Sequence, residues 1–143
     1  MKKFFFLFTI IFIASLHCFA DQIVKGKVVK VIDGDSFVLD GGKEVRIIGI
    51  DTPEFREPWS EKAKARAESL ILGKEVEIEV CKEKKEDTYG RILATIRVGK
   101  TDVGATLISE GFAFPYFLSS CGSSLTNSYH DFSNKAEVAK KGI

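Results

Sequence analysis

Apolar and polar positions alternate along much of this chain, a period of two that is typical of β-strands with one buried face. Residues 74–80 give the clearest case, because Val76, Ile78 and Val80 are separated by glutamates. Shorter apolar runs bounded by Asp-Gly or Gly-Gly turn sequences predict further strands. Five strands are expected, over residues 24–32, 36–39, 43–50, 74–80 and 91–98.

Helical spacing replaces alternation in three other stretches. In residues 60–72, the apolar residues Ala63, Ala67 and Leu70 recur at helical spacing, and a glycine follows where a helix would end. The segment 119–128 is small and polar, so it is expected to form a loop. The other two helices are expected from Val103 to just before Gly111 and on the stripe Tyr129, Phe132, Ala136 and Ala139. This order of elements predicts one mixed α and β domain, with helices packed on a small barrel.

The amino terminus has the pattern of a secretory signal peptide, which is a basic head, an apolar run and small residues before a cleavage point. The head is Met1-Lys2-Lys3, residues 4–14 are apolar almost throughout, and Cys18-Phe19-Ala20 ends the stretch. The run is shorter than the roughly 20 apolar residues of a membrane span. We expect residues 1–20 to be a signal peptide and 21–143 to be the mature domain, periplasmic or secreted. An uncleaved membrane anchor is the alternative.

The charge balance excludes a partner recognised by overall charge alone. The chain has 21 lysines and arginines against 20 acids, a net charge of +1. Removing residues 1–20, with their two lysines, leaves a net charge of −1. Nucleic-acid-binding domains are often strongly basic. Any nucleic-acid site in this protein must therefore depend on where individual cations are placed.

The mature region contains two cysteines, Cys81 and Cys121. An even pair in an exported protein suggests a disulfide, and two buried thiols are the alternative. The bond would close a loop of about 40 residues and stabilise the fold by about 3–4 kcal/mol. The chain has only two histidines, His17 and His130, so it offers almost no ligands for a zinc site.

Two stretches place acids and an arginine at turns and strand ends. They are residues 33–36, Asp-Gly-Asp-Ser, and residues 45–54, Val-Arg-Ile-Ile-Gly-Ile-Asp-Thr-Pro-Glu. Carboxylates at such positions can converge on a hard cation, which prefers oxygen ligands. Acids are also common turn formers, so Asp33, Asp35 and Asp51 could have only that role.

Together with Asp87-Thr88-Tyr89-Gly90-Arg91, these stretches resemble the signature of the staphylococcal nuclease (thermonuclease) family. The order and rough spacing match, and the resemblance covers nearly all of residues 24–142. It implies an α+β fold that is mainly β, a five-stranded OB-fold barrel with three helices. It also implies a calcium-dependent endonuclease that hydrolyses DNA and RNA with little sequence specificity and leaves 3′-phosphate ends. A monomer is expected, with no stable protein partner and no membrane contact in the mature form.

The resemblance also implies a metal site and a base. Asp35, Asp51 and a backbone oxygen of Thr52 would ligate Ca²⁺. Glu54 would be the general base that activates or orients the attacking water. The alternative for Glu54 is an acid that stabilises the amino terminus of the following helix.

Arg46 and Arg91 resemble the pair that grips the scissile phosphate, where a guanidinium fork can neutralise charge in the transition state. Surface ion pairs with Glu44 or Asp87 are the alternative. Arg46 and Asp51 have opposite parity in a regular strand, so their side chains should face opposite sides. Both can line one site only if the strand bends or ends before Asp51.

Tyr89 and Tyr116 could stack on the nucleotide or donate a hydrogen bond to it. Tyr89 lies inside a matched motif, whereas Tyr116 aligns loosely and could equally belong to the core. Thr88 stands where the best-known relative has a lysine, and the loop after Glu54 is short. Both departures are expected to weaken substrate binding or shift its preference.

Two other functions compete with the nuclease. The same barrel could bind single-stranded nucleic acid or another polyanion without cleaving it. An envelope-attached structural protein with an uncleaved amino terminus is the third possibility. The presence of Glu54, Arg46 and Arg91 favours the enzyme.

Overall fold

Strand formation follows the alternating segments in the computed structural model, which describes residues 23–117, 121 and 123–142. Within the segment 75–80, Val76 and Ile78 are buried while Glu75 and Glu79 are exposed. The strands are β1 (Ile23–Val31), β2 (Ser36–Leu39), β3 (Glu44–Ile47), β4 (Ile50–Asp51), β5 (Glu75–Val80), β6 (Ile92–Val98), β7 (Thr101–Asp102) and β8 (Phe114–Pro115).

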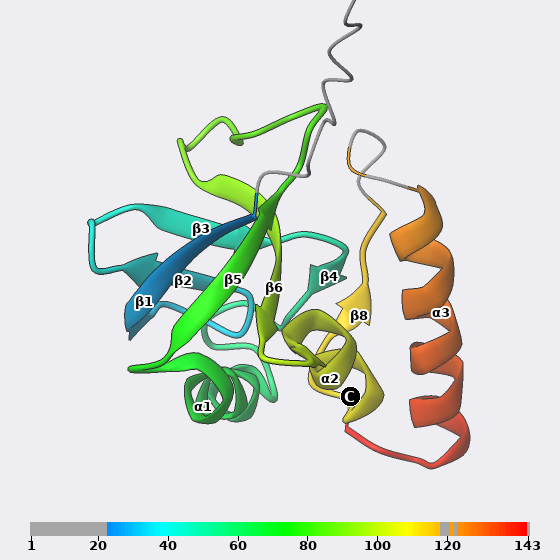
Figure 1. Ribbon diagram of the computed structural model, residues 1–143. Helices are drawn as coiled ribbons and strands as arrows, with labels where there is room; N and C mark the ends of the chain where they lie inside the picture. Colours follow the sequence, from blue (N-terminus) through cyan, green and yellow to red (C-terminus); the bar gives the residue numbers. More distant parts are fainter. Residues whose placement is uncertain (1–22, 118–120, 122, 143) are drawn as a thin grey trace, which may run out of the picture.

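Three helices accompany these strands: α1 (Ser60–Ile71), α2 (Val103–Ser109) and α3 (Ser123–Val138). Helix α1 lies where the spacing of its alanines predicts it, and Ala63 and Ala67 are buried. The Asp102 side chain accepts a hydrogen bond from the Ala105 N–H and so caps α2. In Figure 1, α1 lies across one end of the barrel, and α3 stands beside α2 on the other side of β8.

The sheet closes into a barrel. Its strand order is β3-β2-β1-β5-β6-β7, and an additional pairing of β3 with β6 joins the ends. The closing pair is parallel, with Arg46 opposite Leu93, whereas the other pairs are antiparallel. The register shifts within β1 between Val28 and Lys30, an irregularity of the kind that bends a strand. The predicted five-stranded mixed barrel with three helices is confirmed, since β1, β2, β3, β5 and β6 form it.

The core fills the barrel and the space beneath the helices. Its larger members from the strands are Val28, Phe37, Val45, Ile47, Val76, Ile78 and Ile96, and those from the helices are Ile71, Leu107, Ile108 and Tyr129. The Tyr129 hydroxyl donates to Asp102 Oδ1 at 3.0 Å. Burial is the main cause that raises the pKa of Tyr129, and the Asp102 carboxylate raises it further. The phenol is therefore a neutral donor that joins α3 to the start of α2.

The predicted strand over residues 43–50 was too long. It divides into β3 and the short β4, which pairs with β8 in a separate two-stranded sheet. The chain turns at Ile48-Gly49, where Gly49 has a φ of 80°, a left-handed conformation that glycine adopts without strain. The bend that the opposite parity of Arg46 and Asp51 required is therefore present.

The expectation of a loop over residues 119–128 was wrong for its second half, because α3 begins at Ser123. Leu125 lies four positions before Tyr129, on the same face of the helix, and both pack on the core. One apolar residue therefore extends the helical stripe through a polar sequence. Residues 118–120 and 122 lie outside the described residues.

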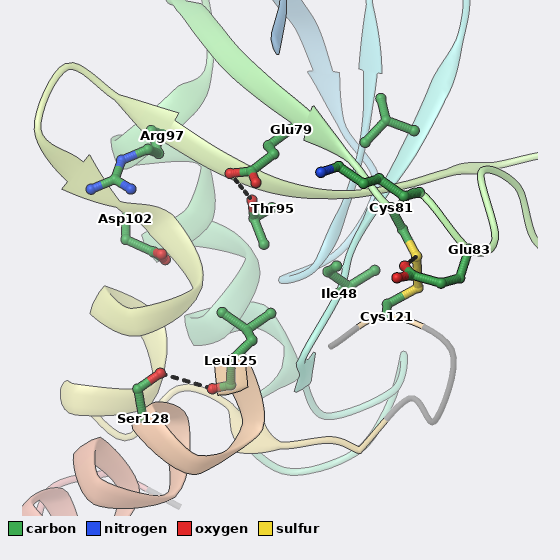
Figure 2. A pocket seen from close by; sticks show the side chains of 12 residues that line it. Ile48, Glu79, Cys81, Glu83, Thr95, Arg97, Asp102, Cys121, Leu125 and Ser128 are labelled. Atoms are coloured by element: carbon green, nitrogen blue, oxygen red, sulfur yellow. Dashed lines mark hydrogen bonds between the residues drawn. A yellow bond between two sulfur atoms is a disulfide. The ribbon is translucent and has the colours of Figure 1, made fainter. Parts of the chain in front are cut away.

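Cys81 and Cys121 form a disulfide, with their Cα atoms 5.5 Å apart, so the predicted bond is present. Cys81 follows β5 directly, and the two cysteines pack with Ile48 and Leu93 in a small apolar cluster. Figure 2 shows this disulfide close to Ile48. The expected signal peptide, residues 1–20, lies outside the described residues. Within the part of the chain that is described, no helix is long and apolar enough to cross a membrane.

Candidate active site

A cleft of about 450 Å³ opens beside the end of β3 and brings together segments far apart in the sequence. Seven of the eight predicted site residues line it, from the turn before β2, strands β3 and β4, the loops before α1 and β6, and the segment after β8. They are Asp35, Arg46, Asp51, Glu54, Tyr89, Arg91 and Tyr116. Thr52 lies in an adjoining cleft that Asp51 also lines.

Arg46 is the most constrained side chain of the cleft. Its Nη1 donates to the carbonyl oxygens of Ile47 at 2.6 Å and Ile50 at 3.0 Å, so the guanidinium spans the turn between β3 and β4. It also contacts Asp35 Oδ2 at 3.3 Å and Asp51 Oδ1 at 3.1 Å. The turn at Gly49 therefore places one cation against two carboxylates that a straight strand would separate.

Asp35 is almost fully buried beneath this cation. Its Oδ2 accepts from the backbone N–H and the hydroxyl of Thr52, both at 3.0 Å, and its Oδ1 accepts from Ser36 Oγ at 3.0 Å. Burial raises the pKa of Asp35 to about 6, while the positive charge of Arg46 opposes that rise. A buried carboxylate that accepts this many hydrogen bonds holds the neighbouring segments in place, so Asp35 is more than a turn former.

Arg91 approaches from the loop before β6. Its Nε donates to Asp87 Oδ2 at 2.7 Å and its Nη1 to Ser36 Oγ at 3.3 Å. Burial alone would raise the pKa of Asp87, but hydrogen bonds from the Arg91 N–H, the Arg91 side chain and the Tyr89 N–H hold it below its ordinary value. The ion pair of Arg91 with Asp87, which was the alternative expectation, is present and partly buried. It fixes the guanidinium at the cleft.

The Ser36 hydroxyl connects the two arginines. It donates to Asp35, which contacts Arg46, and it accepts from Arg91. A single hydroxyl thus joins two cations that come from β3 and from the loop before β6. The sequence places Ser36 in the Asp-Gly-Asp-Ser run but does not predict that its hydroxyl links the two sides of the site.

Glu54 lines the cleft with an exposed side chain from a tight turn. Its N–H donates to Glu57 Oε2 at 2.7 Å, and the Glu57 N–H donates to the Glu54 carbonyl at 2.8 Å. No hydrogen bond joins the Glu54 carboxylate to another described residue. The turn therefore fixes the backbone of Glu54 and leaves its carboxylate open to water.

Two tyrosines form the outer part of the cleft. Tyr89 is exposed, and the guanidinium carbon of Arg91 lies 5.5 Å from its ring centroid. Tyr116 donates its backbone N–H to the Gly49 carbonyl at 2.9 Å and leaves half of its side chain exposed. Tyr116 is therefore not a core residue, which was the alternative expectation.

The oxygen donors of this cleft fit a hard cation. Asp35 and Asp51 contact one guanidinium and so lie on the same wall, and Asp51 Oδ2 has no hydrogen-bond partner among the described residues. The described residues contain no group of three or more His, Cys, Asp or Glu side chains that could hold a metal. Backbone carbonyls and water would have to complete the coordination, which is usual for calcium.

Lys84 also lines the cleft, and sequence reasoning missed it. It lies in the charged loop 82–86, where nothing in the spacing distinguishes one lysine from another. Its position adds a third cation to the cleft, beside Arg46 and Arg91. Glu57 was likewise seen only as part of a short loop.

Barrel and cleft together define an OB-fold protein whose cleft places two arginines beside carboxylates. A family model described as staphylococcal nuclease homologue matches residues 44–143. This match covers well over half of the chain, so the protein belongs to the staphylococcal nuclease family.

Individual relatives agree with this assignment. The chain is 36% identical over 96 residues to the thermonuclease of Staphylococcus hyicus, a match that covers 61% of this chain and 56% of the relative. It is 29% identical over 119 residues to the micrococcal nuclease of Shigella flexneri, covering 75% and 66%. An uncharacterized endonuclease of Escherichia coli is 33% identical over 120 residues, covering 81% and 74%. The chain thus spans less than two thirds of the length of the first two relatives.

Proposed function

We propose that this protein is a calcium-dependent endonuclease that hydrolyses phosphodiester bonds of DNA and RNA with little sequence specificity. The observation that carries the proposal is the meeting of Arg46, Arg91 and Glu54 in one cleft, beside the carboxylates of Asp35 and Asp51. Two fixed guanidinium groups suit a phosphate, and the open carboxylate suits a water molecule. The names of the relatives support the same activity.

The substrate phosphate would bind between the two guanidinium groups. Each is held by a carboxylate, so little side-chain entropy is lost when the phosphate binds. Both stay charged at any physiological pH and can neutralise the charge that builds up on the phosphoryl oxygens. Because these contacts reach the backbone of the substrate and not its bases, sequence specificity should be slight.

Glu54 would act on the attacking water. Its carboxylate orients the water and accepts its proton while the water oxygen bonds to phosphorus. The bond from phosphorus to the 5′ oxygen breaks, the 5′ oxygen takes a proton from water and leaves as a hydroxyl, and a 3′-phosphate end remains. Asp35, Asp51 and the Thr52 carbonyl would hold Ca²⁺, whose positive charge supplies Lewis-acid stabilisation of the same phosphate.

The test is digestion of single-stranded DNA by the purified protein with calcium and with a chelator, beside the Glu54→Gln variant. We expect cleavage with calcium only, and a loss of roughly 10²–10⁴-fold in turnover for Glu54→Gln with the fold retained. Glu79→Gln, a matched change outside this cleft, should cleave normally. Near-normal activity of Glu54→Gln would remove Glu54 as the base. A folded protein that binds DNA without cleaving it would be the binding module instead.

We also propose that residues 1–20 direct export and that 21–143 acts as a monomer in the periplasm or the medium. The disulfide supports this, because such bonds persist mainly in oxidising compartments. The exported protein should begin at Asp21. A first residue of Met1 would point to an uncleaved anchor.

A further inference from the structure

A second cleft, of about 360 Å³, adjoins the candidate active site. Asp51 lines both clefts, so they are continuous at that residue. Four of the seven residues that line the second cleft carry apolar rings, namely Pro53, Pro58, Trp59 and Phe114. Nothing in the reaction proposed above uses these four residues.

The pairing of β4 with β8 sets where Phe114 lies. Asp51 is the direct cross-strand partner of Phe114, so their side chains share one face of this small sheet. Tyr116 lies two positions further along and continues the pairing through its hydrogen bond to Gly49. Phe114 and Tyr116 therefore share that face, about 7 Å apart along the strand.

These two rings are placed as a base-stacking surface would be. Phe114 is 52% exposed and Tyr116 is 49% exposed, although large aromatic side chains usually bury most of their area. Aromatic residues at alternate positions of a strand are how sheet and barrel proteins stack successive bases. Tyr116 faces the candidate active site and Phe114 faces the second cleft, so the pair spans both.

The charge around the second cleft is suited to a base rather than a phosphate. Glu57 places a negative charge on its wall, which disfavours an anion. One cation stands close, since Lys62 Nζ lies 4.0 Å from the Trp59 ring centroid. The aromatic rings of Trp59 and Phe114 are groups on which a nucleobase can stack.

We propose that the second cleft binds the base of the nucleotide next to the one in the candidate active site, stacked on Phe114 and against Trp59. The inference rests on the proposed nuclease function and adds a second contact to its substrate. A base in a duplex has its faces covered by its neighbours, so it must leave the stack to reach Phe114.

The experiment uses single-stranded oligonucleotides with one cleavable linkage, the other linkages being made resistant. In two further substrates, the nucleotide on the 5′ side or on the 3′ side of that linkage lacks its base. The wild-type protein should lose about 5- to 100-fold in kcat/KM with one of the two, as expected for one lost stacking contact. Phe114→Leu should cleave the intact strand with a kcat/KM lower than that of the wild type by the same factor. Removing the same base should then lower the kcat/KM of this variant little further.

Two further variants make the comparison specific. Phe114→Tyr keeps a ring and should respond to base removal like the wild type. Phe117→Ser changes an exposed aromatic residue of the same segment that is not among the lining residues of either cleft, and it should also respond like the wild type. Thermal unfolding confirms that each variant is folded.

The outcomes separate the two proposals. Equal losses on base removal in the wild type and in Phe114→Leu would overturn the subsite while leaving the nuclease intact. If the folded wild type cleaves no strand with calcium, the proposed function fails. The same substrates then test the subsite through binding, where the base-dependent loss of affinity must again depend on the Phe114 ring.

Discussion

Two clefts of similar size lie on either side of Ile48 and differ in what their polar groups do. The larger one, about 530 Å³, adjoins the disulfide, and Figure 2 shows the side chains that line it. There Glu79 accepts from Thr95 at 3.5 Å, and Asp102 is occupied by the Ala105 N–H and the Tyr129 hydroxyl. The carboxylates of Glu79 and Asp102 therefore make hydrogen bonds within the fold.

The cleft of about 450 Å³ has the opposite organisation. Carboxylates hold Arg46 and Arg91 in place, while the Glu54 carboxylate has no hydrogen bond to a described residue. Volume alone would select the cleft beside the disulfide. The convergence of held cations and one open carboxylate selects the other, and it is the better guide to chemistry.

The comparison is tested most strongly by a matched pair of arginines. Arg91→Lys should lower kcat/KM by roughly 10²–10³-fold, because an ammonium cannot reproduce the fork that contacts the phosphate. Arg97→Lys makes the same change in the cleft beside the disulfide and should leave kcat/KM unchanged. Equal effects of the two substitutions would show that the clefts were assigned wrongly.

The disulfide beside the larger cleft gives the second prediction. Cys81→Ser combined with Cys121→Ser should lower the free energy of unfolding by about 3–4 kcal/mol, the value for a loop of this length. Urea unfolding of the oxidised protein and the double variant measures the difference. Activity per folded molecule should change far less than in Arg91→Lys, because neither cysteine contacts the substrate. An unfolding free energy equal to that of the oxidised protein would rule out the stabilising role.

The smallest expected effect concerns two lysines of one loop. Lys84→Ala should weaken DNA binding and reduce the slope of log affinity against log salt by about 1, as expected when one phosphate contact is lost. Lys82→Ala, in the cleft beside the disulfide, should leave the slope unchanged. Salt titrations of binding by fluorescence anisotropy, with Glu54→Gln as the background, separate the two. Equal slopes for both variants would remove Lys84 from the substrate path.

The sequence predicts most of the fold because local periodicity and tertiary burial agree. The alternation in 75–80 and the alanine spacing in α1 are examples. The prediction fails where a single residue sets the conformation of a segment against the pattern of its neighbours. Gly49 ends β3 early through its backbone conformation, and Leu125 alone extends α3 through a polar segment.

The candidate site was predictable as a set of residues but not as an arrangement. Motif order identifies Arg46 and Arg91, yet only the parallel pairing of β3 with β6 brings Arg46 near the loop that carries Arg91. The Ser36 link and the position of Lys84 depend on tertiary contacts that leave no pattern in the chain. The second cleft is similar, since Trp59 and Phe114 meet only through tertiary structure.

The parallel pairing that closes the barrel also decides when the cleft comes into existence during folding. Strands β3 and β6 are separated by some 45 positions, and contacts between such distant segments form late because loop closure costs entropy. The two guanidinium groups are therefore apart until the barrel closes. The candidate active site therefore exists only in the folded barrel, and a chain in which β3 and β6 have not paired has no cleft of this kind.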